Sequence, residues 1–271
     1  TNDFGSLGIS GTGTDRVTQW VTGGTFDPED EGKINDVPIG FTFQFYGVNH
    51  TTVDISANGY LCFSDITFNS FTLPAATPNA ANPNNFIAGV WSDLGADTGT
   101  VPAAAHVYTE TLGTAPNREF RVHFEQWPEY AATGAKSFIY RLFETTNVIE
   151  VHYGTCSIFA AFGARTGVEN AAGTEGTPSL GGFARTVTPT QADRFTPIVA
   201  GDPEINLQQP AGTNRLTGAT FGVGGLPVGS ATGITITVQN LGATQNLNVT
   251  SVSAAPSGVG NCTTNTTALT P

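Results

Sequence analysis

Three consecutive segments near the start of the chain alternate apolar and polar residues and predict a β-meander. Val37–Phe45 is apolar at every second position, and Val48–Ser56 alternates again after the turn at Tyr46-Gly47. Asn58-Gly59 then leads into Tyr60–Phe63. Asn-Gly between alternating segments is a strong hairpin signal, because both central residues need positive φ. We therefore expect three antiparallel strands around which the first domain is built.

The same period of two continues toward residue 200 and predicts a sheet with one buried face. In Arg118–Trp127, for example, Phe120, Val122 and Phe124 alternate with polar residues. Alternation of this kind indicates that one face packs on a core while the other meets water. The further expected strands of this domain are Arg16–Thr22, Phe86–Ser92, His106–Leu112, Ser137–Thr145, Val148–Tyr153, Phe162–Glu169 and Arg194–Val199. The predicted fold is all-β, an antiparallel β-sandwich.

Composition changes along the chain and predicts three parts. Residues 1–14 form an N-terminal arm rich in Gly, Thr and Ser, residues 15–200 form the β-sandwich, and aromatic residues become rare after the linker that begins at Ala200. Residues 201–271 are expected to form an immunoglobulin-like module that is incomplete, with an open edge that can accept another strand. Its expected strands are Glu204–Leu207, Arg215–Phe221, Gly233–Asn240 and Leu247–Ser253.

The overall composition fits many short strands and an extracellular setting. The 271 residues include 33 Gly and 16 Pro, and the net charge is −12. An acidic surface repels phosphate, so we expect neither a nucleic-acid partner nor attraction to an anionic membrane. The chain has no apolar run of about 18 residues, so membrane insertion is not expected. It starts at Thr1 without an apolar leader, and we interpret it as a mature segment of a secreted or cell-surface protein.

The chain has three cysteines, none of them in a Cys-x-x-Cys pair, so the sequence predicts neither a zinc site nor a redox motif. Cys62 and Cys156 lie in or beside expected strands. They either form a disulfide in an oxidising compartment or remain two buried thiols. Cys262 would then pair beyond this segment or with another chain.

Two acidic turns are candidate calcium sites. Asp27, Glu29, Asp30 and Glu31 lie in the first turn, and Asp93 and Asp97 in the second. Closely spaced carboxylates can supply the 6–8 oxygen ligands that Ca²⁺ takes, although neither turn has the spacing of an EF-hand. The alternative is a pair of solvated acidic turns. The candidate metal ligands are Asp27, Glu29, Asp30, Asp93 and Asp97.

The sequence offers no catalytic motif, so we do not expect an enzyme. It has neither a Gly-x-Ser-x-Gly elbow nor a His-Glu-x-x-His motif. His123 and His152 fall on outward-facing strand positions and are expected at the surface. Most aromatic residues at period two fit a sandwich core. Trp127, which precedes Pro128, is the aromatic residue we expect to be exposed, and it is a candidate sugar-binding residue.

Four Asn-x-Ser/Thr sequences are candidate glycosylation sites. Their asparagines are Asn49, Asn248, Asn261 and Asn265. In a chain rich in Thr and Asn such sequences also arise by chance, so glycosylation remains a hypothesis.

Two families resemble parts of this chain. VPIGFTFQFYG, ISANGYLCFS, NNFIAGVWSDL, APNREFRVHFEQWPEY, FIYRLFETTNVIEVHYG, TGVEN and RFTP occur in this order. Together they resemble a β-sandwich module of bacterial secreted and surface proteins, which is appended to subtilisin-like peptidases and adhesins and is distantly similar to the nidogen extracellular domain. GDPEINLQQPAG and ITVQNLG resemble immunoglobulin-like modules named choice-of-anchor D, related to the ASH domain. These resemblances imply extracellular scaffolding or adhesion and no catalytic residues.

Composition and resemblance together give two functional hypotheses. The first is an extracellular structural protein: a subunit of a surface fibre, sheath or layer, or a segment of an adhesin. Copies would assemble through β-strand edges, at the open second domain or at the arm of residues 1–14, as a homo-oligomer or with further domains of a longer chain. The alternative is a carbohydrate- or cell-wall-binding accessory module of a secreted hydrolase. Calcium is the one cofactor considered.

Overall fold

The chain divides into two compact units, Thr1–Pro197 and Ile198–Pro271. A computed structural model describes residues 2–21, 27–66, 73–96, 100–130, 134–156, 163–189 and 191–197 of the first unit. In the second unit it describes the backbone of residues 205–208, 214–215 and 237–240. The sequence predicts the domain boundary between residues 200 and 201.

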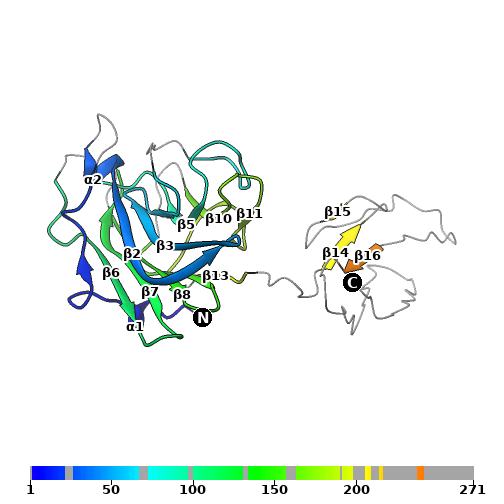
Figure 1. Cartoon of the computed structure of the whole chain (residues 1–271). Coiled ribbons are helices and arrows are strands. Elements are labelled where there is room, and N and C mark those ends of the chain that lie inside the picture. Colours follow the sequence, from blue (N-terminus) through cyan, green and yellow to red (C-terminus); the bar gives the residue numbers. More distant parts are fainter. Residues whose placement is uncertain are drawn as a thin grey trace, which may run out of the picture. The chain divides into compact units, whose positions relative to one another are not determined.

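Two antiparallel sheets form the first unit, which confirms the predicted β-sandwich (Figure 1). The six-stranded sheet has the order β1-β6-β7-β8-β9-β13, and the larger sheet has the order β11-β10-β5-β4-β3-β2, with β12 beside β10. The first sheet contains β1 (Thr14–Asp15), β6 (His106–Leu112), β7 (Glu119–Pro128), β8 (Ala135–Phe143), β9 (Ile149–Tyr153) and β13 (Ala192–Phe195). The second contains β2 (Lys33–Phe45), β3 (Val48–Ser56), β4 (Tyr60–Cys62), β5 (Phe86–Trp91), β10 (Ala164–Glu169), β11 (Gly176–Pro178) and β12 (Ala184–Arg185).

The predicted meander is present as β2, β3 and β4. Val37, Phe43 and the other apolar residues of β2 at period two are buried in the core between the sheets. Gly59 has the positive φ that the Asn-Gly turn requires. The predicted strand Arg16–Thr22 is wrong: this stretch makes only a single bridge between Val21 and Lys33 in the described residues.

A second, smaller apolar cluster lies on the opposite face of the larger sheet. Tyr60, Cys62, Phe86 and Trp91 project there and pack with Phe183. β5 is therefore buried on both faces, as its continuous apolar run predicts. Gly89 is required in this strand, because a Cβ at this position would lie 2.7 Å from Val151 Cγ1.

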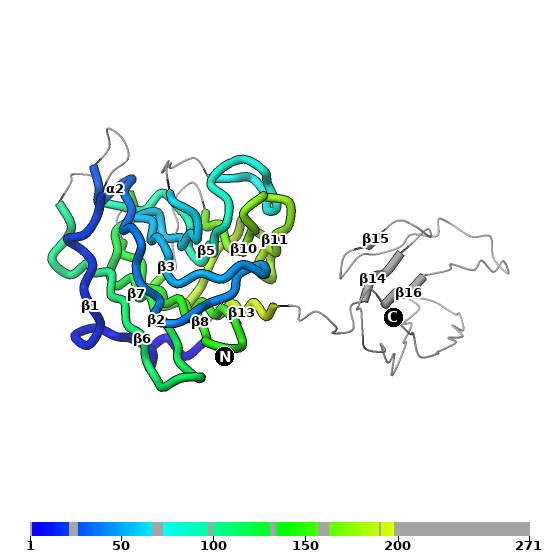
Figure 2. The backbone as a smooth tube through the Cα atoms, viewed as in Figure 1, coloured from blue at the N-terminus to red at the C-terminus, as the bar shows by residue number. Residues whose placement is uncertain are grey.

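Among the described residues of this unit, two short helices accompany the sheets. α1 (Phe4–Leu7) belongs to the N-terminal arm, and α2 (Pro28–Glu31) replaces the expected acidic turn with a helical one. Figure 2 shows the arm in dark blue beside β6, with which β1 pairs. No helix among the described residues is long and apolar enough to cross a membrane.

The described strands of the second unit form one small antiparallel sheet. They are β14 (Ile205–Gln208), β15 (Asn214–Arg215) and β16 (Thr237–Asn240), in the order β15-β14-β16. These elements do not show an immunoglobulin-like module. The expected strand Leu247–Ser253 lies outside the described residues.

Candidate functional site

Three carboxylates from two distant segments meet at one end of the sandwich. Asp30 and Glu31 end α2, and Asp93 follows β5. One carboxylate oxygen of each residue lies within 4.8 Å of those of the other two. We call Asp30, Glu31 and Asp93 the carboxylate cluster. The two acidic turns of the sequence therefore supply one site between them.

The local structure brings these segments into direct contact. The amide of Ala96 donates to the carbonyl oxygen of Glu29 at 3.1 Å. Gly95 adopts φ +148, and a Cβ there would lie 2.5 Å from the Cα of Asp30. Only glycine allows this approach, because it has no Cβ and tolerates positive φ.

Asn58 links both segments to the turn between β3 and β4. Its Nδ2 donates to Glu31 Oε2 at 2.9 Å, and its Oδ1 accepts from the amide of Leu94 at 2.9 Å. The sequence indicates the turn at Asn58 but not this bridging role. The buried Asn58 thus fixes the Glu31 carboxylate relative to the chain that carries Asp93.

Burial and like charge raise the pKa values of Glu31 and Asp93 in the carboxylate cluster. The pKa of Glu31 rises to about 8, chiefly through burial and then through Asp30, while the hydrogen bond from Asn58 opposes the rise. Burial, followed by the charge of Glu129, also raises the pKa of Asp93. The neighbouring Glu129 is itself bonded to the buried Lys136 at 2.7 Å.

The structure brings two of the predicted metal ligands together and adds a third. Asp30 and Asp93 are in the carboxylate cluster, and Glu31 completes it. Asp27 is exposed at the start of α2 and lies outside the cluster, as does the carboxylate of Glu29. Asp97 lies outside the described residues.

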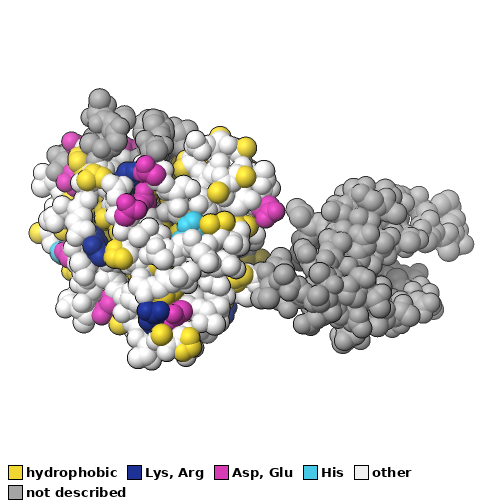
Figure 3. Space-filling model, in the orientation of Figure 1, with side chains coloured by type: hydrophobic (Ala, Val, Ile, Leu, Met, Phe, Trp, Pro, Cys, Tyr) yellow, Lys and Arg dark blue, Asp and Glu magenta, His cyan; other side chains and the backbone are white. Residues whose placement is uncertain are grey.

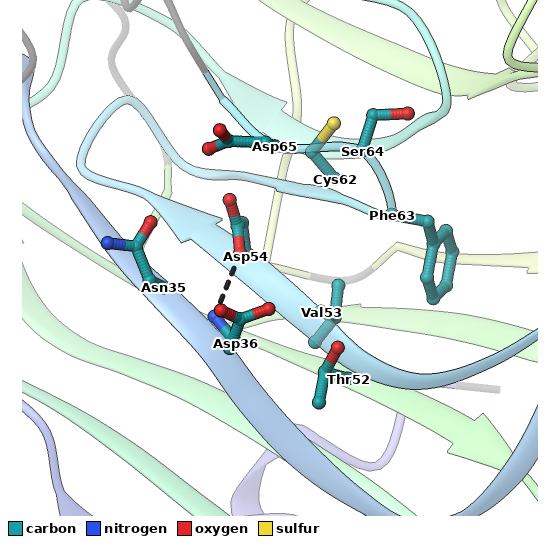
Figure 4. A pocket seen from close by; sticks show the side chains of 9 residues that line it. All are labelled: Asn35, Asp36, Thr52, Val53, Asp54, Cys62, Phe63, Ser64 and Asp65. Atoms are coloured by element: carbon teal, nitrogen blue, oxygen red, sulfur yellow. Dashed lines mark hydrogen bonds between the residues drawn. The ribbon is translucent and has the colours of Figure 1, made fainter.

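A second acidic feature is the cavity of about 210 Å³ that β2, β3 and the segment after β4 enclose (Figure 4). Asp54 is buried in its wall, where its carboxylate accepts from the amides of Asp36 at 2.9 Å and Ile66 at 3.1 Å. Lys33 Nζ lies 3.8 Å from the same carboxylate. Asp54 therefore links the chain after β4 to the β2–β3 hairpin, and we assign it a structural role.

Of the two alternatives for Cys62 and Cys156, the structure shows the second, because both are buried free cysteines and not a disulfide. β4 turns Leu61 toward the core between the sheets and Cys62 to the opposite face. Cys156 lies in the core, where its thiol bonds to the carbonyl oxygen of Ser137. Burial raises the pKa of each thiol to about 12, so neither is a reactive thiolate near neutral pH.

The expectation that Trp127 is exposed is wrong. Its side chain is fully buried, and its Nε1 donates to the carbonyl oxygen of Ala57 at 2.9 Å. The register of β7 shifts between Phe124 and Trp127, so that one extra residue lies opposite β8, and Gln126 adopts φ +50. This β-bulge reverses the alternation and turns Trp127 into the core.

The two outward-facing histidines are also buried, contrary to expectation. The N-terminal arm covers them: the ring of Phe4 packs edge-on against His123 at 5.7 Å, and the amide of Asp3 donates to His152 Nδ1 at 3.1 Å. Neither ring nitrogen of His123 has a hydrogen-bond partner in the described part of the chain. The alternation along β7 correctly predicts that His123 lies on the outer face of the sheet. It does not reveal that the N-terminal arm covers this face.

Acid is expected to destabilise this region through His123. Burial lowers the pKa of His123 to about 4, against an opposing effect of Glu125, while an unfolded histidine titrates near 6.5. Between these values the unfolded chain binds a proton that the folded chain does not. The free energy of unfolding therefore falls as the pH falls from about 6.5 to 4, by up to about 3 kcal/mol. Urea unfolding at pH 7 and pH 4.5 measures this loss.

The matched variant is His123→Phe, which keeps an aromatic ring against Phe4 and Tyr108. Carboxylates also titrate in this range, so the informative quantity is the difference between the two proteins. His123→Phe should lose distinctly less stability than the wild type between the two pH values. Equal losses would contradict the assignment to His123.

One of the four predicted glycosylation sites is in the described residues. Asn49 is exposed on β3, and its Oδ1 lies 3.4 Å from Gln44 Nε2. Asn248, Asn261 and Asn265 lie outside the described residues. On the face shown in Figure 3, most of the described surface is neutral and charged side chains are sparse.

Comparison with known proteins gives one match. The model of a family described as NIDO related matches residues 11–207, which covers the β-sandwich and the start of the second unit. No curated protein and no solved structure matches the chain.

Proposed function

The chain belongs to the NIDO-related family, and on that premise we propose that it is an extracellular structural protein without catalytic activity of its own. A NIDO-related domain indicates an extracellular module, and the match supports the nidogen-like resemblance of the first domain. The resemblance of the second part to a choice-of-anchor D module remains a prediction. In the proposed role the protein is a subunit of a surface fibre, sheath or layer, or a segment of an adhesin.

The N-terminal arm is the observation that carries this proposal. Leu7 and Ile9 are buried against the six-stranded sheet, and Arg121 donates to the carbonyl oxygen of Leu7 at 2.8 Å. Asn2 Nδ2 donates to the carbonyl oxygen of Tyr153 at 2.7 Å. β1 adds to the edge of the sheet beside β6. Residues 2–15 thus act as a clamp whose contacts lie mostly on other elements.

A clamp of this kind can act between copies as well as within one chain. The arm of one copy, placed on the sheet of the next, would make the same contacts and add β1 to the edge strand β6 of its neighbour. Such a head-to-tail contact is heterologous and does not close by itself, so repeated contacts produce a filament. The proposal therefore links copies through strand edges, as a homo-oligomer.

The edge of the larger sheet that lies beside β6 also favours the arm as the assembly contact. β2 is the edge strand there, and side chains from β6 and from the residue before β7 bond to its backbone. Thr111 Oγ1 donates to the carbonyl oxygen of Ile39 at 2.8 Å, and Arg118 Nη1 donates to that of Gly40 at 2.6 Å. Bonded edge groups are unavailable to an added strand.

The alternative role, a carbohydrate-binding accessory module, has less support. Its candidate residue, Trp127, has no exposed ring face on which a sugar can stack.

A cysteine pair across the arm distinguishes assembly between copies from packing within one. Thr14 and Thr109 are direct partners of β1 and β6, at a spacing that a disulfide can bridge. Oxidation of the Thr14→Cys/Thr109→Cys variant, carrying also Cys262→Ser, is expected to give covalent oligomers that lengthen with protein concentration. Non-reducing gel electrophoresis and intact mass measure them.

The single variant Thr109→Cys with Cys262→Ser is the matched control and should not form a ladder. A second measurement is light scattering on the chain with and without residues 1–15, where deletion should abolish oligomers. Two results together would rule out assembly through the arm. The double-cysteine variant would form its disulfide within monomers at every concentration, and light scattering would find the same oligomeric state with and without residues 1–15.

A further inference from the structure

The carboxylate cluster has the composition and dimensions of a divalent-cation site. We propose that Asp30, Glu31 and Asp93 bind one Ca²⁺ ion, which fastens α2 to the segment after β5. Calcium–oxygen distances of 2.3–2.6 Å place two ligands of one ion at most about 5 Å apart. The three carboxylate oxygens, all within 4.8 Å of one another, therefore satisfy the distance limit for common ligands.

The carboxylate of Asp93 is the second, independent indication of a ligand. Asp93 is 9% exposed, and its side chain makes no hydrogen bond or ion pair with any residue that the structure describes. Its oxygen instead faces those of Asp30 and Glu31. A buried carboxylate without a partner is unfavourable, whereas a bound cation replaces the lost hydration.

The cluster combines three neighbouring acidic side chains with a neutral donor that holds one of them in place. Glu31 is 4% exposed and lies beside two further acidic side chains. The buried amine nearby, that of Lys136, is bonded to Glu129. Asn58 holds the Glu31 carboxylate in place by donating to Oε2. The site is therefore preorganised by a neutral donor.

The chemistry of the ligands selects calcium among the common metals. Three carboxylates are hard oxygen ligands, and the cluster contains no histidine or cysteine. Zinc prefers nitrogen and sulfur, while magnesium requires near-ideal octahedral geometry and releases its water reluctantly. Calcium accepts irregular arrangements, and water can complete its 6–8 ligands. Sites in extracellular modules bind calcium with Kd of roughly 10⁻⁴–10⁻³ M.

Binding is expected to stabilise the folded chain by mass action. The ion joins α2 to Asp93, which lies 62 positions after Glu31 in the sequence. At 10 mM CaCl₂, about a hundred times a Kd of 10⁻⁴ M, we expect the Tm of the first unit to rise by roughly 5–10 °C. Neither the N-terminal arm nor its edge contact is required for this effect, so the test is independent of the proposed function.

Calorimetry and thermal unfolding of the full chain test the proposal. After EDTA treatment and dialysis, titration with CaCl₂ is expected to show a site with Kd below about 1 mM, and 10 mM CaCl₂ is expected to raise Tm. Asp93→Asn should weaken binding at least 10-fold and remove most of the rise in Tm. Asp30→Asn is the second variant, in case Asp93→Asn does not fold by circular dichroism.

Asp27→Asn is the matched control, because Asp27 is an exposed acid of the same turn outside the cluster. It should bind and respond like the wild type. Identical titrations of the wild type, Asp30→Asn and Asp93→Asn would overturn the site, as would the absence of any calcium effect on Tm. An equal stabilisation by 10 mM MgCl₂ would overturn the assignment of calcium.

Discussion

Replacing Trp127 with alanine is expected to lower the free energy of unfolding of the first unit by about 4 kcal/mol. The side chain is fully buried, packs against Trp20 at 5.1 Å between ring centroids, and contacts Phe124 edge-on. Truncation of a buried tryptophan removes the transfer energy of the ring and leaves a cavity, which together cost about 3–5 kcal/mol. It also leaves the carbonyl oxygen of Ala57 without the indole donor.

Guanidinium unfolding followed by tryptophan fluorescence and circular dichroism measures this loss. Leu180→Ala is the control, because Leu180 is 94% exposed and its truncation should change stability by less than about 0.5 kcal/mol. A Trp127→Ala protein as stable as the wild type would contradict the buried position. The expected destabilisation also affects how a binding experiment is interpreted. Loss of sugar binding in Trp127→Ala would report unfolding and not the loss of a contact with the sugar.

Local pattern was sufficient to predict most of the sandwich. The alternation of Val37–Phe45 and the Asn58-Gly59 turn correspond to β2 and to the β3–β4 hairpin. The continuous apolar run of β5 predicts a strand covered on both faces. The structure confirms this, because Phe86 packs in the smaller apolar cluster and Ile87 packs in the core between the sheets. These features are local because a strand's side chains alternate regardless of what covers each face.

Features that depend on long-range packing were not accessible from the sequence. One extra residue near Gln126 reversed the side-chain alternation at Trp127, and no local signal marks that bulge. The sequence placed His123 on the outer face correctly, but the arm that covers it comes from residues more than a hundred positions earlier. The exposure of these two side chains therefore could not be predicted from the alternation of residues along the strand.

The carboxylate cluster was predictable from the sequence in its residue types but not in its final set of ligands. Composition identified Asp30 and Asp93 as metal candidates, each in its own turn. The fold joins the turns through Asn58 and through the close approach of Gly95 to Asp30. Residue type thus pointed to the chemistry, while the choice of ligands depended on a contact between distant segments.

The second large effect is expected from Asp193→Ala, which should cost about 3–5 kcal/mol. Asp193 Oδ2 accepts from Tyr153 at 2.5 Å and from Ser179 at 2.7 Å, and it pairs with the guanidinium of Arg185. The side chains of Asp193 and Arg185 are each 8% exposed. Removing one partner of a buried pair leaves an uncompensated buried charge, which accounts for the expected cost. Urea unfolding at pH 7 measures it.

Replacing both Arg185 and Asp193 separates two quantities: the cost of leaving one buried charge unpaired, and the net contribution of the ion pair to the free energy of unfolding. Arg185→Met/Asp193→Leu should recover most of the lost stability, because a packed apolar pair avoids the desolvation of two ions. Arg194→Ala is the matched control on the same strand: the Arg194 side chain is 59% exposed, so its pair with Glu150 should contribute less than about 1 kcal/mol. If the double variant were as unstable as Asp193→Ala, the hydrogen bonds from Tyr153 and Ser179, rather than the charge of Arg185, would account for the loss.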